Sequence, residues 1–152
     1  MTDIIHKDDV DQLKFVLNYC AGNQYIDCVQ QLENHINENM EIGTVDTIHH
    51  FAPDVYMRQM DAKAGDLVVS KMHRTEHMNI LLKGSITILT EDGVQYLEAP
   101  IVLKSRAGTK RIGYFHEDSS WITVHPTNET DLEKIEELVI VPKEQEKLFL
   151  EN

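Results

Sequence analysis

The spacing of hydrophobic residues changes near residue 46 and divides the chain into two kinds of predicted structure. Before that point, apolar residues recur every three or four positions in two runs, Val10 to Cys20 and Ile26 to Ile36. Such spacing places an apolar stripe along one side of a helix. Ala21-Gly22-Asn23 interrupts the pattern, so we predict two short helices joined by a turn. Because short helices are marginally stable alone, residues 1–46 are expected to pack on the rest of the chain.

From residue 47 to residue 142, short apolar runs alternate with turn residues instead. Glu91-Asp92-Gly93 is a strong hairpin signal, and Ala64-Gly65-Asp66 marks another turn. Many short strands separated by roughly 8–12 residues are typical of an antiparallel sandwich or barrel. A short acidic helix is predicted from Leu132 to Leu138, after several candidate capping residues. Residues 143–152 are expected to form a charged tail.

The charge balance and the apolar runs exclude two classes of partner. The formal net charge is −12 at pH 7, whereas proteins that bind nucleic acid by neutralising phosphates need clustered Lys and Arg. No apolar run approaches the roughly 20 residues that span a bilayer, and the N-terminus lacks a basic region followed by an apolar block. We therefore expect a cytoplasmic protein with no nucleic-acid and no membrane partner. Cys20 and Cys28 are expected to be reduced.

Polar residues within the strand region indicate a pocket inside the fold. Side chains alternate across a strand, so His77 and Asn79 share one face of their strand. Lys71 and His73 share one face of the preceding strand in the same way. If both faces point inward, these polar side chains lie among aliphatic residues. A buried polar group without a partner costs about 1–3 kcal/mol, so the patch is a candidate binding site.

The segment from Gly65 to Gly84 resembles the first motif of the cupin superfamily. In that motif a glycine precedes two histidines that flank one residue, and an acid and a second glycine follow. His73 matches the second histidine, and Gly84 matches the closing glycine. Lys71 stands at the first histidine position, and His77 stands at the acid position.

A second segment is similar to the second cupin motif. Gly108 matches its glycine, and Arg111 stands where the last metal-binding histidine would be. The resemblance covers about residues 50–126 and implies a jelly-roll barrel that often holds a metal at its centre. The predicted fold is therefore mainly β. We expect a single antiparallel jelly-roll barrel over residues 47–142, with two short N-terminal helices and a short C-terminal helix.

Longer phrases of the sequence resemble small cupin-like proteins encoded by bacteriophages and prophages. These phrases include His73-x-Thr75-Glu76-His77-x-Asn79-Ile80 and Trp121-x-Thr123-Val124-His125-Pro126-Thr127. The resemblance implies a viral or prophage source and a location in the host cytoplasm. It implies no established activity.

Histidines in this region favour a divalent metal as one ligand. Neutral imidazoles suit Zn, Fe and Ni, and three protein ligands are usual at a catalytic metal centre. His125 is the best third histidine, because it shares a strand face with Trp121 and Thr123. The candidate metal ligands are His73, His77 and His125.

Lys71 and Arg111 favour an anionic ligand instead, because two cations would repel a dication. Arg holds a carboxylate or phosphate through two hydrogen bonds, and Lys adds a point charge. The candidate residues for binding an anionic small molecule are Lys71, His73, His77, Asn79 and Arg111.

Two classes of function follow from these alternatives. The first is a small-molecule-binding protein whose pocket holds an anionic metabolite, a divalent metal or both. The second is a cupin enzyme, either a metal-free sugar-nucleotide epimerase or isomerase or a metal-dependent oxygenase. The departures at Lys71 and Arg111 count against the oxygenase. A homodimer is expected, because the edge strands of a jelly roll need to be covered.

Overall fold

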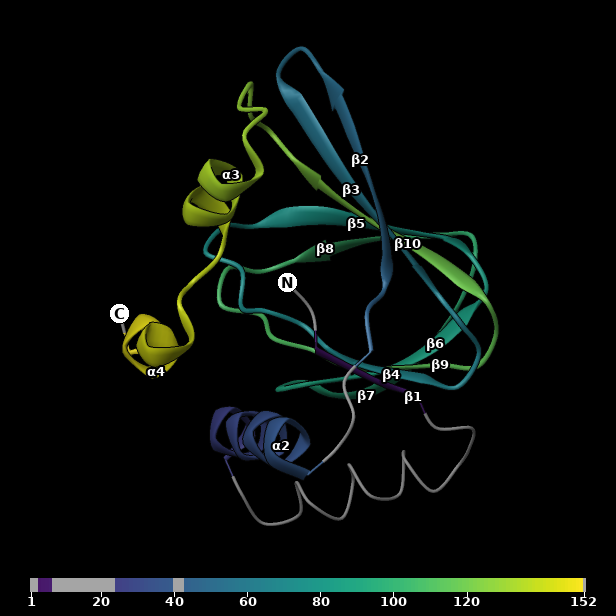
Figure 1. The fold of residues 1–152 in the computed structure, drawn as a ribbon, viewed down its shortest axis with the longest axis vertical. Helices are drawn as coiled ribbons and strands as arrows, with labels where there is room; N and C mark the ends of the chain where they lie inside the picture. The colour runs from purple at the N-terminus through teal and green to yellow at the C-terminus, as the bar shows by residue number, and fades with distance from the viewer. Residues whose placement is uncertain (1–2, 7–23, 40–42, 152) are drawn as a thin grey trace.

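Two antiparallel five-stranded sheets lie face to face in the computed structural model, which describes residues 3–6, 24–39 and 43–151 (Figure 1). Sheet A consists, in spatial order, of β1 (Asp3–His6), β4 (Asp66–Val69), β9 (Ile112–Phe115), β6 (Ser85–Thr90) and β7 (Gly93–Glu98). Sheet B consists, in spatial order, of β2 (Asp46–Ala52), β3 (Val55–Ala62), β10 (Ser119–His125), β5 (His77–Lys83) and β8 (Ile101–Ser105).

The eight strands from β3 to β10 are connected in jelly-roll order. Counted from one to eight along the chain, they stand as 2-7-4-5 in sheet A and 1-8-3-6 in sheet B. Nearly all successive strands therefore cross from one sheet to the other, as in the paired Greek keys of a jelly roll. The predicted mainly β, antiparallel architecture is confirmed. The strands pair as two separate sheets, so the predicted barrel takes the form of a two-sheet sandwich.

One helix, α2 (Tyr25–Asn39), covers the outer face of sheet A (Figure 1). Its apolar stripe of Val29, Leu32 and Ile36 packs in one cluster with residues of sheet A, namely Leu67, Val69, Ile112 and Tyr114. α2 stands where the periodicity predicts the second N-terminal helix. The predicted first helix falls on residues 7–23, outside the described residues. β1 pairs with β4 at the start of the segment that was expected to be helical.

Cys28 on α2 corrects one expectation from the sequence. Its side chain is fully buried, and it is disulfide-bonded rather than reduced. Cys20 lies outside the described residues.

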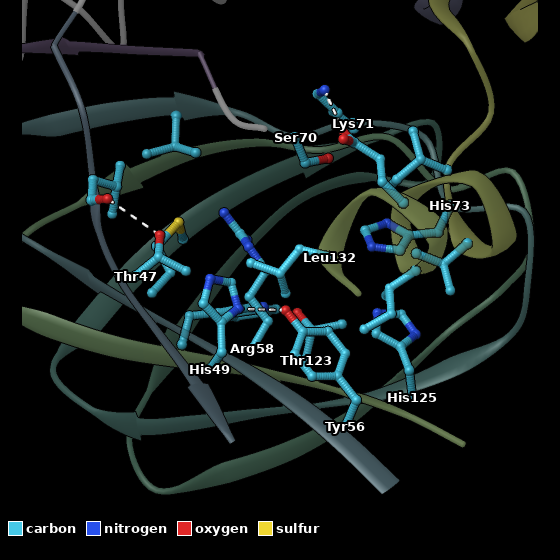
Figure 2. Close-up of a pocket in the computed structure, with 18 of the residues that line it drawn as sticks. Thr47, His49, Tyr56, Arg58, Ser70, Lys71, His73, Thr123, His125 and Leu132 are labelled. Atoms are coloured by element: carbon cyan, nitrogen blue, oxygen red, sulfur yellow. Dashed lines mark hydrogen bonds and ion pairs between the residues drawn. The ribbon is translucent and has the colours of Figure 1, made fainter. Parts of the chain in front are cut away.

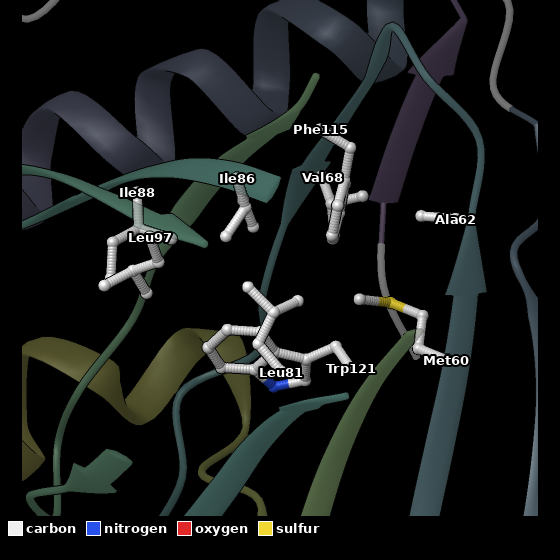
Figure 3. Close-up of a cluster of buried hydrophobic side chains, with 9 residues drawn as sticks. All are labelled: Met60, Ala62, Val68, Leu81, Ile86, Ile88, Leu97, Phe115 and Trp121. Atoms are coloured by element: carbon white, nitrogen blue, oxygen red, sulfur yellow. The ribbon is translucent and has the colours of Figure 1, made fainter. Parts of the chain in front are cut away.

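The main hydrophobic core fills part of the space between the sheets (Figure 3). Met60, Leu81 and Trp121 contribute from sheet B, and Val68, Ile86 and Phe115 contribute from sheet A. Truncating a buried aromatic side chain to alanine costs about 3–5 kcal/mol. This apolar cluster is therefore a main contributor to the packing of one sheet on the other.

The C-terminal segment returns to the sandwich in two short helices. α3 (Leu132–Val139) begins at Asp131, whose carboxylate accepts hydrogen bonds from the backbone N–H groups of Glu133 and Lys134. After α3, Ile140 forms an isolated antiparallel bridge with His73. The 3₁₀ turn η1 (Lys143–Gln145) and α4 (Glu146–Leu150) follow where a charged tail was expected. Among the described residues, none of the helices is long and apolar enough to cross a membrane.

A buried ionic cluster fixes α4 to the rest of the fold. The Lys110 ammonium contacts the carboxylates of Glu33 on α2 and Glu146 on α4, and the Lys110 Nζ to Glu146 Oε2 distance is 2.8 Å. The side chains of Lys110 and Glu146 are each only 2% exposed. Gln30 Nε2 also donates to Glu146 Oε1, at 3.1 Å. Burial raises the pKa of Glu33, and the nearby Lys110 lowers it.

Replacing Lys110 with methionine should destabilise the protein strongly. Lys110→Met leaves two buried carboxylates without their cation, and breaking a buried ion pair in this way costs about 3–5 kcal/mol. Lys147→Met is the control, because Lys147 pairs with Asp27 at the surface, where its side chain is 57% exposed. Exposed pairs contribute at most about 1 kcal/mol. Urea unfolding of both variants measures the difference, and equal losses would contradict a structural role for the buried cluster.

Candidate functional site

The antiparallel register of sheet B arranges inward-facing side chains in rows across the strands. One row is mostly apolar and belongs to the core: Thr47, Met60, Trp121, Leu81 and Ile101. The next row, two residues along each strand, is mostly polar: His49, Arg58, Thr123, Asn79 and Leu103. Because residues two apart share a face of a strand, the apolar core passes directly into a polar cavity.

Three histidines converge beyond the polar row. The ring centroids of His73 and His77 are 4.3 Å apart, and His125 lies 5.5 Å from His73 and 5.3 Å from His77. His77 begins β5 and His125 ends β10, whereas His73 lies in the segment after β4. Figure 2 shows His73 and His125 at the same side of the cavity. The structure therefore brings together the three histidines that the sequence proposes as metal ligands.

Two of these rings have a nitrogen that forms no hydrogen bond within the described residues and can bind a ligand. His77 Nδ1 lies 2.9 Å from the carbonyl oxygen of Thr75. A carbonyl can only accept, so Nδ1 carries the proton and Nε2 holds a lone pair when the ring is neutral. His77 Nε2 and His125 Nδ1 are both buried without a hydrogen-bond partner in the described part of the chain.

All three imidazoles are held in the neutral form. Burial, followed by the charges of His77 and Arg58, lowers the pKa of His125 to about 4. Burial and the neighbouring His77 lower the pKa of His73 well below its ordinary value. Burial also lowers the pKa of His77, and the charge of Arg111 lowers it further. Neutral imidazole is the form that ligates a metal or accepts a hydrogen bond.

A cavity of about 390 Å³ opens beside the histidines, between sheet B and α3. His73, His125, Arg58 and Arg111 line it, and Leu132 and Glu136 of α3 form part of its wall (Figure 2). His77 and Asn79 are buried next to the cavity and are not among the residues that line it. A volume of this size suits a small molecule.

Arg58 is a residue of the site that the sequence interpretation missed. It lies on β3 opposite Thr123 of β10, and Figure 2 shows it directed toward the cavity near His49. Its Nε is buried without a hydrogen-bond partner, and burial lowers the pKa of its guanidinium. Strict alternation along β3 was the signal that could have found it, since Arg58 shares a face with Tyr56 and Met60.

Arg111 lies where the sequence places it, inside the sandwich. Its guanidinium donates to Ser105 Oγ, and its Cζ lies 5.5 Å from the centroid of the Trp121 ring. Its backbone N–H donates to Ser70 Oγ at 2.8 Å. Burial lowers the pKa of Arg111 to about 10. Its side chain therefore stays charged at neutral pH.

Both guanidiniums have little compensation from acids in the described part of the chain, where Glu136 acts on Arg58 only from a distance. Among the described residues, no carboxylate forms a salt bridge with Arg58 or Arg111. Lys71 differs, because its Nζ lies 2.7 Å from Glu136 Oε1 at the half-exposed edge of the cavity. Lys71 therefore lines the cavity as part of an ion pair, whereas the two arginines have no salt-bridge partner among the residues that the structure describes.

Asn79 organises the wall of the site. Its side-chain Nδ2 donates to Ser105 Oγ at 2.5 Å, and its Oδ1 accepts from Trp121 Nε1 and Thr123 Oγ1, both at 3.3 Å. Since Asn79 is fully buried, these bonds satisfy polar groups that would otherwise be unpaired. Its contact with a ligand stays a prediction.

The side chains at this site are chemically suitable metal ligands, but their spacing is less suitable for holding an ion. Three neutral imidazoles, two of them with an unpartnered nitrogen, are suitable ligands for Zn, Fe or Ni. Within the described residues, however, no three His, Cys, Asp or Glu donors are grouped closely enough to hold an ion. A metal at His73, His77 and His125 would therefore require small movements of the rings.

Comparisons with known proteins concern the fold alone. No protein-family model matches the chain, and no curated protein matches it. Similar solved structures include a putative ethanolamine utilization protein Q from Salmonella typhimurium, with 10% identity, coverage of 57% of this chain and 72% of that chain, and a TM-score of 0.48. KdgF from Halomonas sp. has 14% identity, coverage of 58% and 84%, and a TM-score of 0.49.

A cupin-2 domain containing protein from Shewanella frigidimarina is also similar, with 13% identity, coverage of 63% of this chain and 92% of that chain, and a TM-score of 0.44. Likenesses at TM-scores below 0.5 carry no argument about the site or its activity. The architecture therefore rests on the strand order of this chain.

The buried histidines should make the protein lose stability as the pH falls from neutral toward 4. A depressed pKa means that the folded state holds His125 neutral while the unfolded chain binds a proton near pH 6.5. The stabilisation is full above pH 6.5 and is lost as the pH falls toward 4. For His125 alone the loss is at most about 3 kcal/mol.

The variant His125→Gln isolates this contribution from that of other groups. The slope of unfolding free energy against pH between 7 and 4 should be shallower than in the parent protein. His50→Gln is the control, because His50 is exposed and bonds to Gln59 at the surface. Denaturant titrations at several pH values give the slopes, and identical slopes for both variants would refute the assignment of His125 as a buried neutral base.

Proposed function

We propose that the protein binds a small anionic molecule in the cavity between sheet B and α3. The observation that carries this proposal is the pair of arginines, Arg58 and Arg111, which line the cavity and form no salt bridge with a carboxylate of the described residues. Removing a charge from water is expensive unless an opposite charge compensates it. An anionic ligand supplies that compensation, and a guanidinium can hold a carboxylate or phosphate through two parallel hydrogen bonds.

The histidines make the cavity selective among anionic ligands. His73 and His125 line the cavity in their neutral form, and each neutral imidazole has one nitrogen that accepts a hydrogen bond. Tyr56 adds a hydroxyl that lies 2.7 Å from His49 Nδ1 at the cavity wall. The preferred ligand is therefore an anion that also carries hydroxyl or amine donors.

A divalent metal at His73, His77 and His125 is the second candidate function. The two unpartnered nitrogens favour it, and Arg58 and Arg111 oppose it by repulsion. A bound metal would supply Lewis-acid chemistry, and the metal-dependent oxygenase belongs to this candidate. The metal-free sugar-nucleotide epimerase or isomerase stays a separate alternative. The phage or prophage source, the host-cytoplasm location and the homodimer stay predictions from the sequence.

Anion binding should raise the melting temperature of the protein. A ligand present at a hundred times its dissociation constant stabilises by about 2.7 kcal/mol, or roughly 5–10 °C for a chain of this size. Inorganic phosphate, malonate, citrate and a sugar nucleotide are suitable probes for differential scanning fluorimetry. If none of them shifts the transition, the proposal fails.

Variants at the two arginines separate the cavity from non-specific effects of charge. Arg58→Met and Arg111→Met should abolish the shift, and each should leave the ligand-free protein equally or more stable because an uncompensated buried charge is removed. Lys134→Met is the control, since Lys134 is an exposed cation on α3 that does not line the cavity. A shift that survives in both arginine variants would place the anion elsewhere.

Elemental analysis tests the metal candidate independently. Protein purified without an affinity tag and dialysed after incubation with Zn, Fe or Ni salts should retain about one equivalent of metal if the histidines bind it. His77→Ala should lose that metal, whereas His50→Ala, at an exposed position, should keep it. Absence of stoichiometric metal from the parent protein would eliminate this candidate and leave the anion proposal untouched.

A further inference from the structure

Arg111 lines two cavities, and only one of them is the cavity described above. The second has a volume of about 350 Å³ and lies among the β6–β7 hairpin, β8 and the segment that leads into β9. Arg111 is common to the walls of both. Since its guanidinium has five N–H donors, one side chain can serve ligand atoms in both cavities.

The deep wall of the second cavity offers hydrogen-bond donors. Ser105 Oγ accepts hydrogen bonds from Asn79 Nδ2 and from the Arg111 guanidinium. These two bonds occupy both lone pairs of the Ser105 oxygen. The hydroxyl proton of Ser105 is therefore left to donate, and Ser105 is only 2% exposed. Ile88 and Leu103 supply the apolar part of this wall. Such a wall suits a group that only accepts hydrogen bonds, as an oxyanion does.

The mouth of the second cavity carries more positive than negative charge. Lys104 and Arg106 join Arg111 in its lining, against the carboxylates of Glu91 and Asp92. Arg106 Nη2 already donates to Glu91 Oε1 at 3.0 Å and to Asp92 Oδ2 at 2.7 Å. Arg106 therefore balances one of these two negative charges, and Lys104 Nζ lies 3.7 Å from Glu76 Oε1. Among the described residues, neither hairpin carboxylate forms a salt bridge with Arg111.

We propose that the second cavity binds an oxyanion group and that the protein's ligand carries two such groups, one on each side of Arg111. This inference rests on the proposed anion-binding function and names the class of ligand as a linear dianion, a dicarboxylate or a bisphosphonate-like molecule. Joining both groups in one molecule makes the second contact intramolecular, which strengthens binding without any further contact. A guanidinium that lines both cavities has enough N–H donors for both groups of such a molecule.

Titration calorimetry with two ligand series tests the inference. One series contains linear dicarboxylates of increasing length with the monocarboxylate of each length, and the other contains the corresponding bisphosphonates and monophosphonates. At one length, the dianion should bind at least tenfold more tightly than its single-headed partner. If no length in either series gives such an advantage while single-headed ligands bind, the second cavity is not an anion site and the proposed function still stands.

Variants assign the second group to its cavity. Arg106→Met and Lys104→Met remove exposed cations that contribute little to stability. Each should reduce the advantage of the dianion at least threefold and change the affinity of the single-headed ligand less than twofold. Arg58→Met, in the first cavity, should weaken both ligands, and Lys134→Met should weaken neither.

Equal losses for both kinds of ligand in Arg106→Met or Lys104→Met would overturn the inference, because those cations would then act at long range. If neither kind of ligand binds to the parent protein, the proposed function fails, and the inference fails with it.

Discussion

The pairing register of β10 between β3 and β5 is the constraint on which the site depends. It places Arg58 beside Thr123 and Asn79, and it carries His125 to the end of the same inner face. A shift of one residue would turn every side chain of a strand to the opposite face of the sheet. A shift of β10 would therefore turn His125 toward solvent, and Trp121 would leave the core. The packing of Trp121 therefore stabilises the strand register that orients the polar residues two positions away.

The same closeness of core and cavity explains the electrostatics of the site. Burial beside an apolar row lowers the pKa values of His73 and His125. Arg58 and Arg111 line the same cavity and have no salt-bridge partner within the described residues. An uncompensated buried charge opposes folding, whereas the apolar cluster around Trp121 and the Lys110 cluster under α4 favour it. The protein thus keeps destabilising buried charges within a well-packed sandwich. Residues that lower stability in this way are typical of binding sites.

Local patterns predict more of this structure than of its site. Alternating apolar positions and glycine turns indicate the antiparallel strands, and alternation places His77 and His125 on the inner face of sheet B. His73 lies close to both, although it follows β4 and is not on a strand as predicted. Arg58 escapes notice because a charged residue in a strand usually faces water. The partner of Lys71 is Glu136, which is 65 residues away, and no local pattern reveals such a pairing. For the same reason, a charged C-terminal segment gives no sign that Glu146 is buried against Lys110.

The charge of Arg111 determines which of the two candidate ligands, the anion or the metal, the cavity favours. Burial, together with the charges of nearby arginines, keeps the three imidazoles neutral, but neutral imidazoles do nothing to compensate Arg58 and Arg111. A divalent metal bound alone would increase the uncompensated positive charge inside the sandwich, and the repulsion is strong where water is excluded. An anion bound alone reduces that charge. A metal therefore becomes favourable only together with an anion, whereas the anion needs no metal, so this arrangement of charges favours the proposed anion over the metal.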